Sequence, residues 1–165
     1  MVTIGRRHMT GMLAAAGGLV LCRRVGAAAL PQPPLAVVVG SGTALTDLAV
    51  AALRALFQAD TTMVDGVRLA PFNRPPQSLD RVAFDRLVLG LSPDDVSRFW
   101  IDRRIRGQGR PPRVCEDPSL LARLVIRLPG AIAYVRADKV LPGMKALTIG
   151  GKMPSDAGYQ LKEKT

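Results

Sequence analysis

The sequence predicts an α/β domain in which a layered sheet is flanked by helices. Residues 35–39 form a continuous apolar run of strand length, which is typical of a strand covered on both faces. Further strand-like runs at residues 67–72 and 131–135 alternate with segments whose apolar residues recur at helical spacing. The chain of 165 residues has room for one such domain with a core of its own.

Composition limits how this core is built and which partners the chain attracts. Aromatic residues make up 4% of the chain and hydrophobic residues 48%, so the core must consist mainly of Ala, Val, Leu and Ile. The formal net charge is +10, and removal of the arginines in residues 1–29 leaves about +6 on the rest of the chain. A chain this basic attracts anions.

Residues 1–29 have the layout of an export signal. Arg6 and Arg7 form a basic end without acids, residues 9–21 form a short apolar core, and the small residues that end at Ala29 suit a signal peptidase. The apolar run is shorter than the roughly 20 residues that a membrane span needs. We therefore expect a periplasmic protein that is cleaved near Ala29 and meets the membrane only during export, through either the general secretory or the twin-arginine route.

The turn after the first strand reads Gly40-Ser41-Gly42-Thr43, and residues 46–57 then have helical periodicity. A strand, a glycine-rich turn and a helix cradle phosphate in many α/β proteins, which makes Ser41 and Thr43 candidate anion ligands. The turn lacks the lysine of a P-loop and the third glycine of a dinucleotide-binding fingerprint. An ordinary loop is therefore the alternative interpretation.

Residues 66–90 contain the main candidate for an anion site. A strand at residues 67–72 leads into a proline-stiffened loop, and Ser78 then caps a helix. We expect the apolar face of this helix to contain Leu79, Val82, Ala83, Leu87 and Val88. The first turn of a helix exposes unpaired N–H groups and the positive end of the macrodipole, which suit an anion. Arg74 stands just before this turn and Arg81 within it, which predicts an anion-binding corner; a capped helix after a surface loop is the alternative.

Two further helices have clear N-terminal signals. Ser92-Pro93 begins a helix that ends near Ile105, and Asp117-Pro118 begins a helix that stops before Gly130. In the first of these helices, Asp94 and Asp95 are better explained as partners of the helix dipole than as a catalytic pair.

Residues 103–113 are the most basic stretch of the chain, and arginines of this density bind the phosphates of nucleic acid in other proteins. No aromatic side chain that could stack on a base lies among these arginines. We therefore predict a solvated loop that attracts small anions, and no nucleic-acid partner.

The last third of the chain completes the domain, which we assign to residues 30–150. Residues 145–149 are expected to form a last strand, and residues 151–165 a polar, loose tail. Cys115 is the one cysteine after residue 29, so we expect a small buried hydrophobic residue rather than half of a disulfide.

The order of short motifs between residue 35 and about residue 161 resembles small proteins of the phosphate ABC transporter substrate-binding type. Those proteins are similar to one lobe of the periplasmic phosphate-binding protein. The motifs are LRALF at residues 53–57, DG at 65–66, PFN at 71–73, Phe84, LGLSP at 89–93, FW at 99–100, GQGRPP at 107–112, PGAIAYV at 129–135 and GY at 158–159. The resemblance implies a single lobe of the type II periplasmic-binding-protein fold.

The resemblance also implies a ligand. In the full-length phosphate-binding proteins, the loop before a helix of the second lobe carries an arginine and a Ser-Gly-Thr that hold the anion. Arg74 and Ser78 match that arginine and serine, whereas Leu79 and Asp80 stand where glycine and threonine would be. The resemblance thus implies phosphate or a similar small anion as a weakly bound ligand, with a transporter or a periplasmic protein as partner.

We therefore expect an exported, non-enzymatic solute-binding-like module with no cofactor and no metal. Its anion site is expected to contain Arg74, Ser78, Arg81, Ser41 and Thr43. The alternative is a structural or protein-interaction lobe that has lost its ligand. An enzyme is disfavoured because the single histidine, His8, lies in the expected signal and Cys115 stands alone.

Overall fold

The computed structural model describes residues 32–163, and the segment Pro31–Thr165 forms a compact unit of its own. The expected export signal and its cleavage site near Ala29 lie outside the described residues. None of the described helices has the length and apolar content that a membrane span requires.

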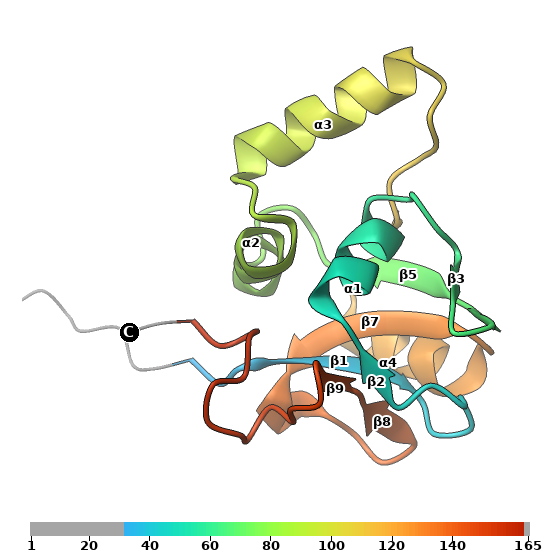
Figure 1. Ribbon diagram of the computed structural model, residues 1–165, viewed down its shortest axis with the longest axis vertical. Coiled ribbons are helices and arrows are strands. Elements are labelled where there is room, and N and C mark those ends of the chain that lie inside the picture. Colours follow the sequence, from blue (N-terminus) through green and yellow to red (C-terminus); the bar gives the residue numbers. More distant parts are fainter. Residues whose placement is uncertain (1–31, 164–165) are drawn as a thin grey trace, which may run out of the picture. The chain divides into compact units, whose positions relative to one another are not determined.

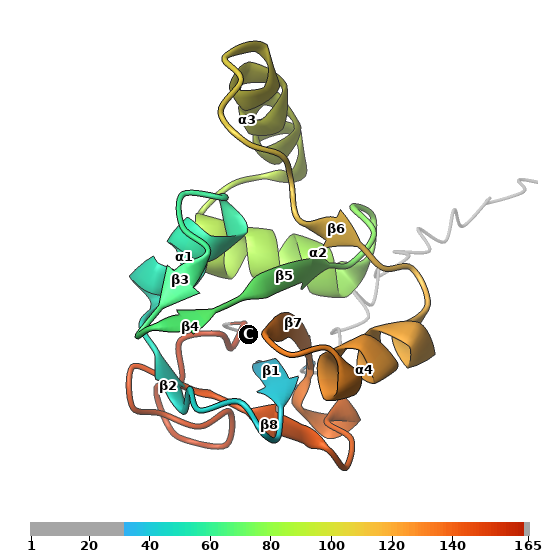
Figure 2. The same ribbon diagram turned by 90° about the vertical axis from the view of Figure 1, so that its right-hand side faces the viewer.

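A five-stranded mixed sheet lies at the centre of the domain, with the strand order β6-β5-β7-β1-β8 (Figures 1 and 2). Its strands are β1 (Leu35–Gly40), β5 (Ala70–Asn73), β6 (Arg113–Val114), β7 (Ala131–Arg136) and β8 (Met144–Ala146). β6, β5 and β7 run parallel, whereas β1 runs antiparallel to both β7 and β8. The predicted α/β fold class, a layered sheet with flanking helices, is confirmed.

Helices cover both faces of this sheet. They are α1 (Val50–Phe57) and α2 (Leu79–Phe84), with a π-helical continuation (Asp85–Leu89), on one face and α4 (Pro118–Arg127) on the other. The remaining helix, α3 (Pro93–Ile105), stands off from the sheet (Figure 1). Along β1, Leu35, Val37 and Val39 join the core under α1 and α2, while Ala36 and Val38 join the smaller core under α4. The prediction that this strand is buried on both faces is therefore confirmed, and it explains why the strand is apolar without alternation.

An aromatic cluster fills the larger core where α1 and α2 meet the sheet. Phe84 of α2 stacks on Tyr134 of β7 with ring centroids 3.9 Å apart, and Phe57 of α1 lies 4.6 Å from Phe84. In a chain with few aromatic residues, these three rings fix the helices against the middle strand of the sheet.

The helix starts agree with the sequence. Ser78, Ser92 and Asp117 each accept a hydrogen bond from a backbone N–H of the first turn, at 3.3, 3.2 and 2.8 Å. Side-chain caps of this kind satisfy a donor that has no partner within the helix.

Several strands are shorter than predicted. The run at residues 67–72 is divided between β4 (Val67–Arg68), which forms a hairpin with β3 (Met63–Val64), and β5 in the main sheet. Asp65 and Gly66 have φ angles of 48° and 76°, so they form the two-residue turn that this hairpin requires.

The expected helix at residues 46–57 begins only at Val50. The residues before it form β2 (Asp47–Leu48), which pairs with β9 (Thr148–Ile149), and the expected last strand is divided between β8 and β9. In both cases, pairing between distant segments replaces the regular element that local periodicity predicts.

The expected apolar face of α2 was only partly right. Leu79 is 73% exposed, whereas Phe84 and Leu89, which were not on that face, are buried. Leu79 and Phe84 come before the π-helical turn at Asp85–Leu89, so that turn does not explain them. The buried face follows Arg81, Phe84, Asp85 and Val88 at helical spacing, and the buried ion pair between Arg81 and Asp85 hides this face from a search for apolar residues.

The tail after residue 150 is packed rather than loose. Tyr159 and Leu161 are buried in the larger core, and the backbone N–H of Leu35 donates to the carbonyl of Leu161 at 3.0 Å. Two apolar side chains in an otherwise polar segment are enough to attach it to the domain, since both bury their apolar area in the larger core.

Candidate functional site

The candidate site lies at the edge of the sheet where the three parallel strands end. The chain leaves β5 through Arg74 and enters α2, and it leaves β6 through Cys115 and enters α4; Figure 2 shows both strands pointing to these loops. Ligands of α/β proteins bind preferentially at the carboxyl ends of parallel strands. The N-termini of α2 and α4 add N–H donors at the same edge.

Arg74 connects the two loops. Its Nη1 atom donates to the carbonyl oxygens of Cys115 and Glu116, each at 3.0 Å, so the guanidinium is directed to the loop before α4 rather than to the first turn of α2. This differs from the expected position, and the reason is that these two carbonyls lie just beyond the end of β6 and are stabilised by a charged donor. Within residues 32–163, Nε and Nη2 of Arg74 make no hydrogen bond, which leaves one edge of the guanidinium open.

A buried polar pair fixes the start of the Arg74 loop. The Tyr134 hydroxyl donates to the Asn73 side-chain oxygen at 3.0 Å and accepts from the backbone N–H of Arg74 at 3.3 Å. Burial raises the pKa of the Tyr134 hydroxyl far above its ordinary value, so it remains a neutral donor. Neither partner was a candidate in the sequence, because an Asn and a Tyr 61 residues apart show no local sign of their contact.

Ser78 has the expected capping role, and its hydroxyl is used twice. It accepts from the Arg81 N–H and donates to the Pro75 carbonyl at 2.8 Å. With the Arg81 N–H taken by the cap, the N–H groups of Leu79 and Asp80 are the donors of the first turn that have no intrahelical acceptor. The open donors of this helix are therefore two backbone groups beside Ser78.

Asp80 is turned away from the first turn and pairs with Arg136 at the end of β7. The Arg136 Nε atom lies 2.7 Å from the Asp80 carboxylate, and its Nη1 donates to the carbonyl of Pro33 at 2.9 Å. An unpaired carboxylate beside an anion would repel it, and this ion pair neutralises the charge. Arg136 was missed in the sequence, where the strand was expected to end one residue earlier.

Arg81 lies inside the domain rather than at the site. It is 5% exposed, and its Nε atom lies 2.8 and 2.6 Å from the two oxygens of the Asp85 carboxylate. Burial raises the pKa of Asp85, and the neighbouring Arg81 opposes that rise. This corrects the expectation that Arg81 is open to a ligand, since its charge is already paired out of contact with solvent.

Ser41 and Thr43 lie at the opposite end of the sheet from Arg74. Val39, Ile132 and Pro71 are neighbours across the sheet, and from there β1 and β5 run in opposite directions. Ser41 and Arg74 are therefore separated by about 16 Å along the strand direction alone. Ser41 and Thr43 would join the site only if their turn faced the same end of the sheet as Arg74. It faces the opposite end, so they do not join the site.

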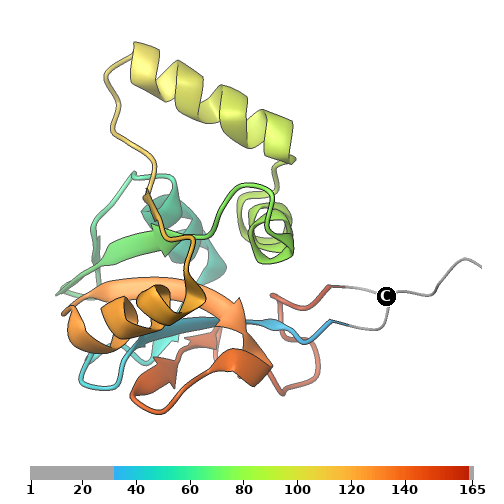
Figure 3. The same ribbon diagram turned by 180° about the vertical axis from the view of Figure 1, so that it is seen from behind.

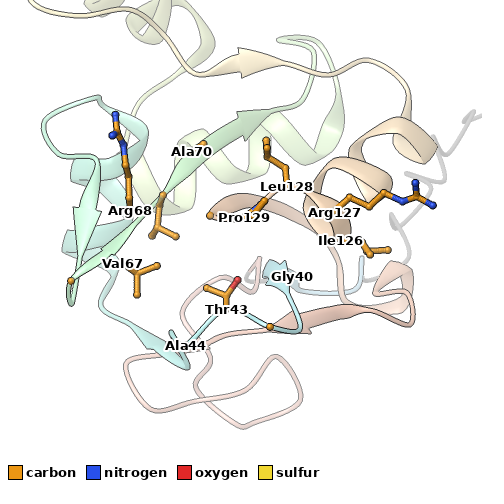
Figure 4. A pocket seen from close by; sticks show the side chains of 14 residues that line it. Gly40, Thr43, Ala44, Val67, Arg68, Ala70, Ile126, Arg127, Leu128 and Pro129 are labelled. Carbon is orange, nitrogen blue, oxygen red and sulfur yellow. The ribbon is translucent and has the colours of Figure 1, made fainter.

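The turn at Ser41 instead borders a hollow of about 750 Å³ that is lined by Gly40, Thr43, Arg68, Ile126 and Gly130, among others. Figure 4 shows the Thr43 side chain directed to this space, while Arg68 and Arg127 extend away from it. With its two cations turned outward, this hollow is less suited to an anion than the edge at Arg74.

Neither the cysteine nor a metal-binding cluster offers a second site in the part of the chain that the structure describes. Cys115 is buried, as expected, and burial raises the pKa of its thiol. Residues 32–163 contain no cluster of His, Cys, Asp or Glu side chains that could ligate a metal ion.

The fold matches solved phosphate receptors. An ABC-type phosphate transport receptor from Vibrio cholerae superimposes with a TM-score of 0.61 and 19% identity, over 76% of this chain and 49% of that chain. A putative phosphate ABC transporter substrate-binding protein with bound phosphate from Clostridium perfringens has a TM-score of 0.61 and 15% identity, over 75% of this chain and 48% of that chain.

A third structure, PstS from Borrelia burgdorferi, has a TM-score of 0.60 and 12% identity, over 80% of this chain and 55% of that chain. No protein-family model matches the chain, and no curated protein matches it in sequence. The chain thus spans about half the length of these receptors. At the level of fold, the resemblance to one lobe of phosphate ABC transporter substrate-binding proteins is confirmed.

Proposed function

We propose that this chain is an exported, non-enzymatic solute-binding module that binds phosphate or a similar small anion weakly at the edge beside Arg74. The observation that supports the proposal is the open Nε and Nη2 edge of Arg74 in a fold shared with phosphate receptors. A guanidinium edge donates two parallel hydrogen bonds to a phosphate, which makes arginine well suited to this ligand.

The proposed site is narrower than the set expected from the sequence. Its donors are Arg74 and the backbone N–H groups of Leu79 and Asp80, with Ser78 as the cap that fixes the turn; Arg81, Ser41 and Thr43 are left out. These donors approach an anion from one side only, so much of its hydration shell stays in place and the affinity is weak. The pattern of residues 1–29 supports a periplasmic location, where a transporter or another periplasmic protein would be the partner.

A protein-interaction lobe without a ligand is the second candidate. It is favoured by the two carbonyl groups that already occupy Nη1 of Arg74. In that case Arg74 is a structural link between two loops.

Calorimetric titration with phosphate and sulfate distinguishes the two candidates. We expect saturable binding of phosphate in the millimolar range. In Arg74→Ala the phosphate affinity should fall about tenfold or more, because a hydrogen bond to a charged group contributes about 1.5–3 kcal/mol. Arg127→Ala is the matched control, since it removes an exposed arginine at the other end of the sheet.

Arg74 also holds the loop before α4, so its removal could act through the fold. A second variant, Arg74→Lys, therefore keeps the charge and loses only the two-donor edge of the guanidinium. Thermal unfolding shows whether each variant is still folded. Equal phosphate affinity in the wild-type and Arg74→Ala proteins, or no heat at millimolar phosphate, would reject the anion site. Recovery of a specific periplasmic protein in a pull-down would then support the interaction lobe.

A further inference from the structure

The C-terminal half of α3 exposes two isoleucines on the side that faces away from the domain. Ile101 is 59% exposed and Ile105 is 80% exposed. At 100° per residue they lie about 40° apart around the helix axis, and roughly opposite to Val96 and Trp100, which join the larger core. Figures 1 and 3 show α3 standing off from the sheet, which fits the exposure of these two side chains.

Arginines surround these isoleucines. The stretch of residues 101–113 contains five arginines and one acid, Asp102. Arg104 flanks the isoleucines on the helix and is exposed, and Arg110 is exposed in the following loop. Exposed apolar side chains beside unpaired cations are a combination that binds anionic membrane surfaces.

The loop after α3 is held close to the helix. Arg103 donates to the carbonyl of Gln108 at 2.8 Å and pairs with Asp60 at 2.6 Å, while its guanidinium carbon lies 5.4 Å from the centre of the Phe99 ring. Arg103 is therefore used to fix the loop, and Arg104 and Arg110 have no ion-pair partner within residues 32–163.

The two free arginines share a hollow. A space of about 770 Å³ is lined by Arg104, Gly107, Gly109, Arg110 and Pro111. Its size is ample for a phosphate group, and its two cations have no acid among the lining residues to neutralise them.

We propose that this tip, defined as Ile101, Arg104, Ile105 and residues 107–111, docks on an anionic phospholipid bilayer. The isoleucines enter the headgroup region. Arg104 and Arg110 bind lipid phosphates in the hollow that these two arginines line. A bilayer fits better than an acidic protein, because a soft headgroup layer accommodates protruding isoleucines without a complementary pocket. This surface departs from the sequence expectation that the chain meets the membrane only during export.

The proposal is independent of the anion site, since the two share no residue. The chain from Pro31 is used for the test because it is a compact unit with its own core, whereas residues 1–30 are basic and apolar and would bind vesicles themselves. Co-sedimentation is measured with vesicles of phosphatidylcholine alone and of phosphatidylcholine mixed with phosphatidylglycerol.

Three double variants separate the contributions. Ile101→Ser/Ile105→Ser removes the apolar contact, Arg104→Gln/Arg110→Gln removes the two cations, and Arg123→Gln/Arg127→Gln removes two exposed cations from α4 as the matched control. We expect binding to the anionic vesicles only, weakening as salt rises, with each tip variant reducing the partition constant about tenfold or more. The control pair is expected to change it by about twofold, through net charge alone.

Failure to bind anionic vesicles at low salt would overturn the proposal, as would an equal loss in the α4 control pair. A loss with the arginine pair but none with the isoleucine pair would mean that charge alone holds the protein on the vesicles, without contact of the isoleucines, and would also overturn the proposal. Titration with inorganic phosphate tests for a free anion: saturable binding that depends on Arg104 and Arg110, without vesicle binding, would replace the membrane by a soluble ligand. Unchanged unfolding temperatures of all variants show that these losses are local.

Discussion

The charges nearest to the candidate site are mostly paired within the protein. Asp80 pairs with Arg136, and Arg81 pairs with Asp85 in the interior. A buried ion pair contributes little net stability, but removal of one partner leaves an unpaired charge that is costly. At the scale of single residues, Arg81 therefore acts on stability, and Arg74 is the residue whose donors remain open.

Substitution of Arg81 by methionine tests this division of roles. We expect Arg81→Met to lower the free energy of unfolding at neutral pH by about 3–5 kcal/mol, because Asp85 is left buried and unpaired. The double variant Arg81→Met/Asp85→Leu should recover most of that loss, since it removes both charges. Urea unfolding followed by circular dichroism measures both values, and a double variant as unstable as the single one contradicts the argument.

The same variant has a pH dependence of definite sign. Burial raises the pKa of Asp85, so its protonated form is favoured in the folded state. The stability that comes from the protonated form is fully present below the unfolded pKa of about 4 and is lost as pH rises through the folded pKa. The penalty of Arg81→Met should therefore shrink on acidification from neutral pH, as the buried carboxyl takes up a proton.

Residues that act locally were predicted from the sequence, and residues that act over distance were not. Ser78, Ser92 and Asp117 cap their helices as expected, because a cap depends on only three or four neighbouring positions. The ion pair between Asp80 and Arg136 joins residues 56 apart in the chain and leaves no mark in either local sequence.

At the scale of elements, Gly130 determines how β7 meets β5. It has a φ angle of 77°, and its carbonyl accepts from the N–H of Ala70 at 2.7 Å as the two strands begin. A Cβ atom at this position would lie 2.3 Å from the carbonyl oxygen of Arg68. The backbones can approach this closely only because residue 130 has no side chain.

We expect Gly130→Ala to lower the free energy of unfolding by about 3 kcal/mol or more, from the strained φ angle and the clash with backbone together. Gly66→Ala is the matched control: its φ angle is 76°, but a Cβ there would meet no atom within 4 Å, so about 1 kcal/mol is expected. Both are measured from urea midpoints. If both variants lose the same free energy of unfolding, the clash with the Arg68 backbone contributes nothing to the loss.

The sequence predicted the long elements and missed the short ones for a physical reason. β1, β7 and α4 are strongly patterned, and α3 begins at a clear Ser-Pro signal, so all four appear within a residue or so of their expected bounds. β2 and β9 have two residues each, and they exist because they pair with one another across the chain. The π-helical turn after Phe84 likewise depends on packing, since Phe84 stacks on Tyr134 of the sheet.

At the scale of the whole domain, the first strand and the last described segment close the fold together. β1 lies between β7 and β8, and the backbone of its first residue, Leu35, bonds to Leu161. The domain is about half as long as a full receptor. It nevertheless has two cores, and β1 contributes side chains to both of them. The expectation of a loose tail failed because Tyr159 and Leu161 belong to the larger of these cores, which the polar composition around them conceals.

Truncation of one side chain in that segment tests whether it is part of the folding unit. Leu161 is fully buried, so Leu161→Ala should lower the free energy of unfolding by about 2–5 kcal/mol through lost burial and an unfilled cavity. Leu141, which is 49% exposed, is the matched control, and Leu141→Ala should cost about 0.5 kcal/mol or less. If the two variants unfold at the same urea concentration, residues 151–163 contribute nothing to the core. If only Leu161→Ala is destabilised and it unfolds in a single transition, the first strand and this segment unfold as one unit. A tail that frays separately would leave the midpoint of the main transition unchanged.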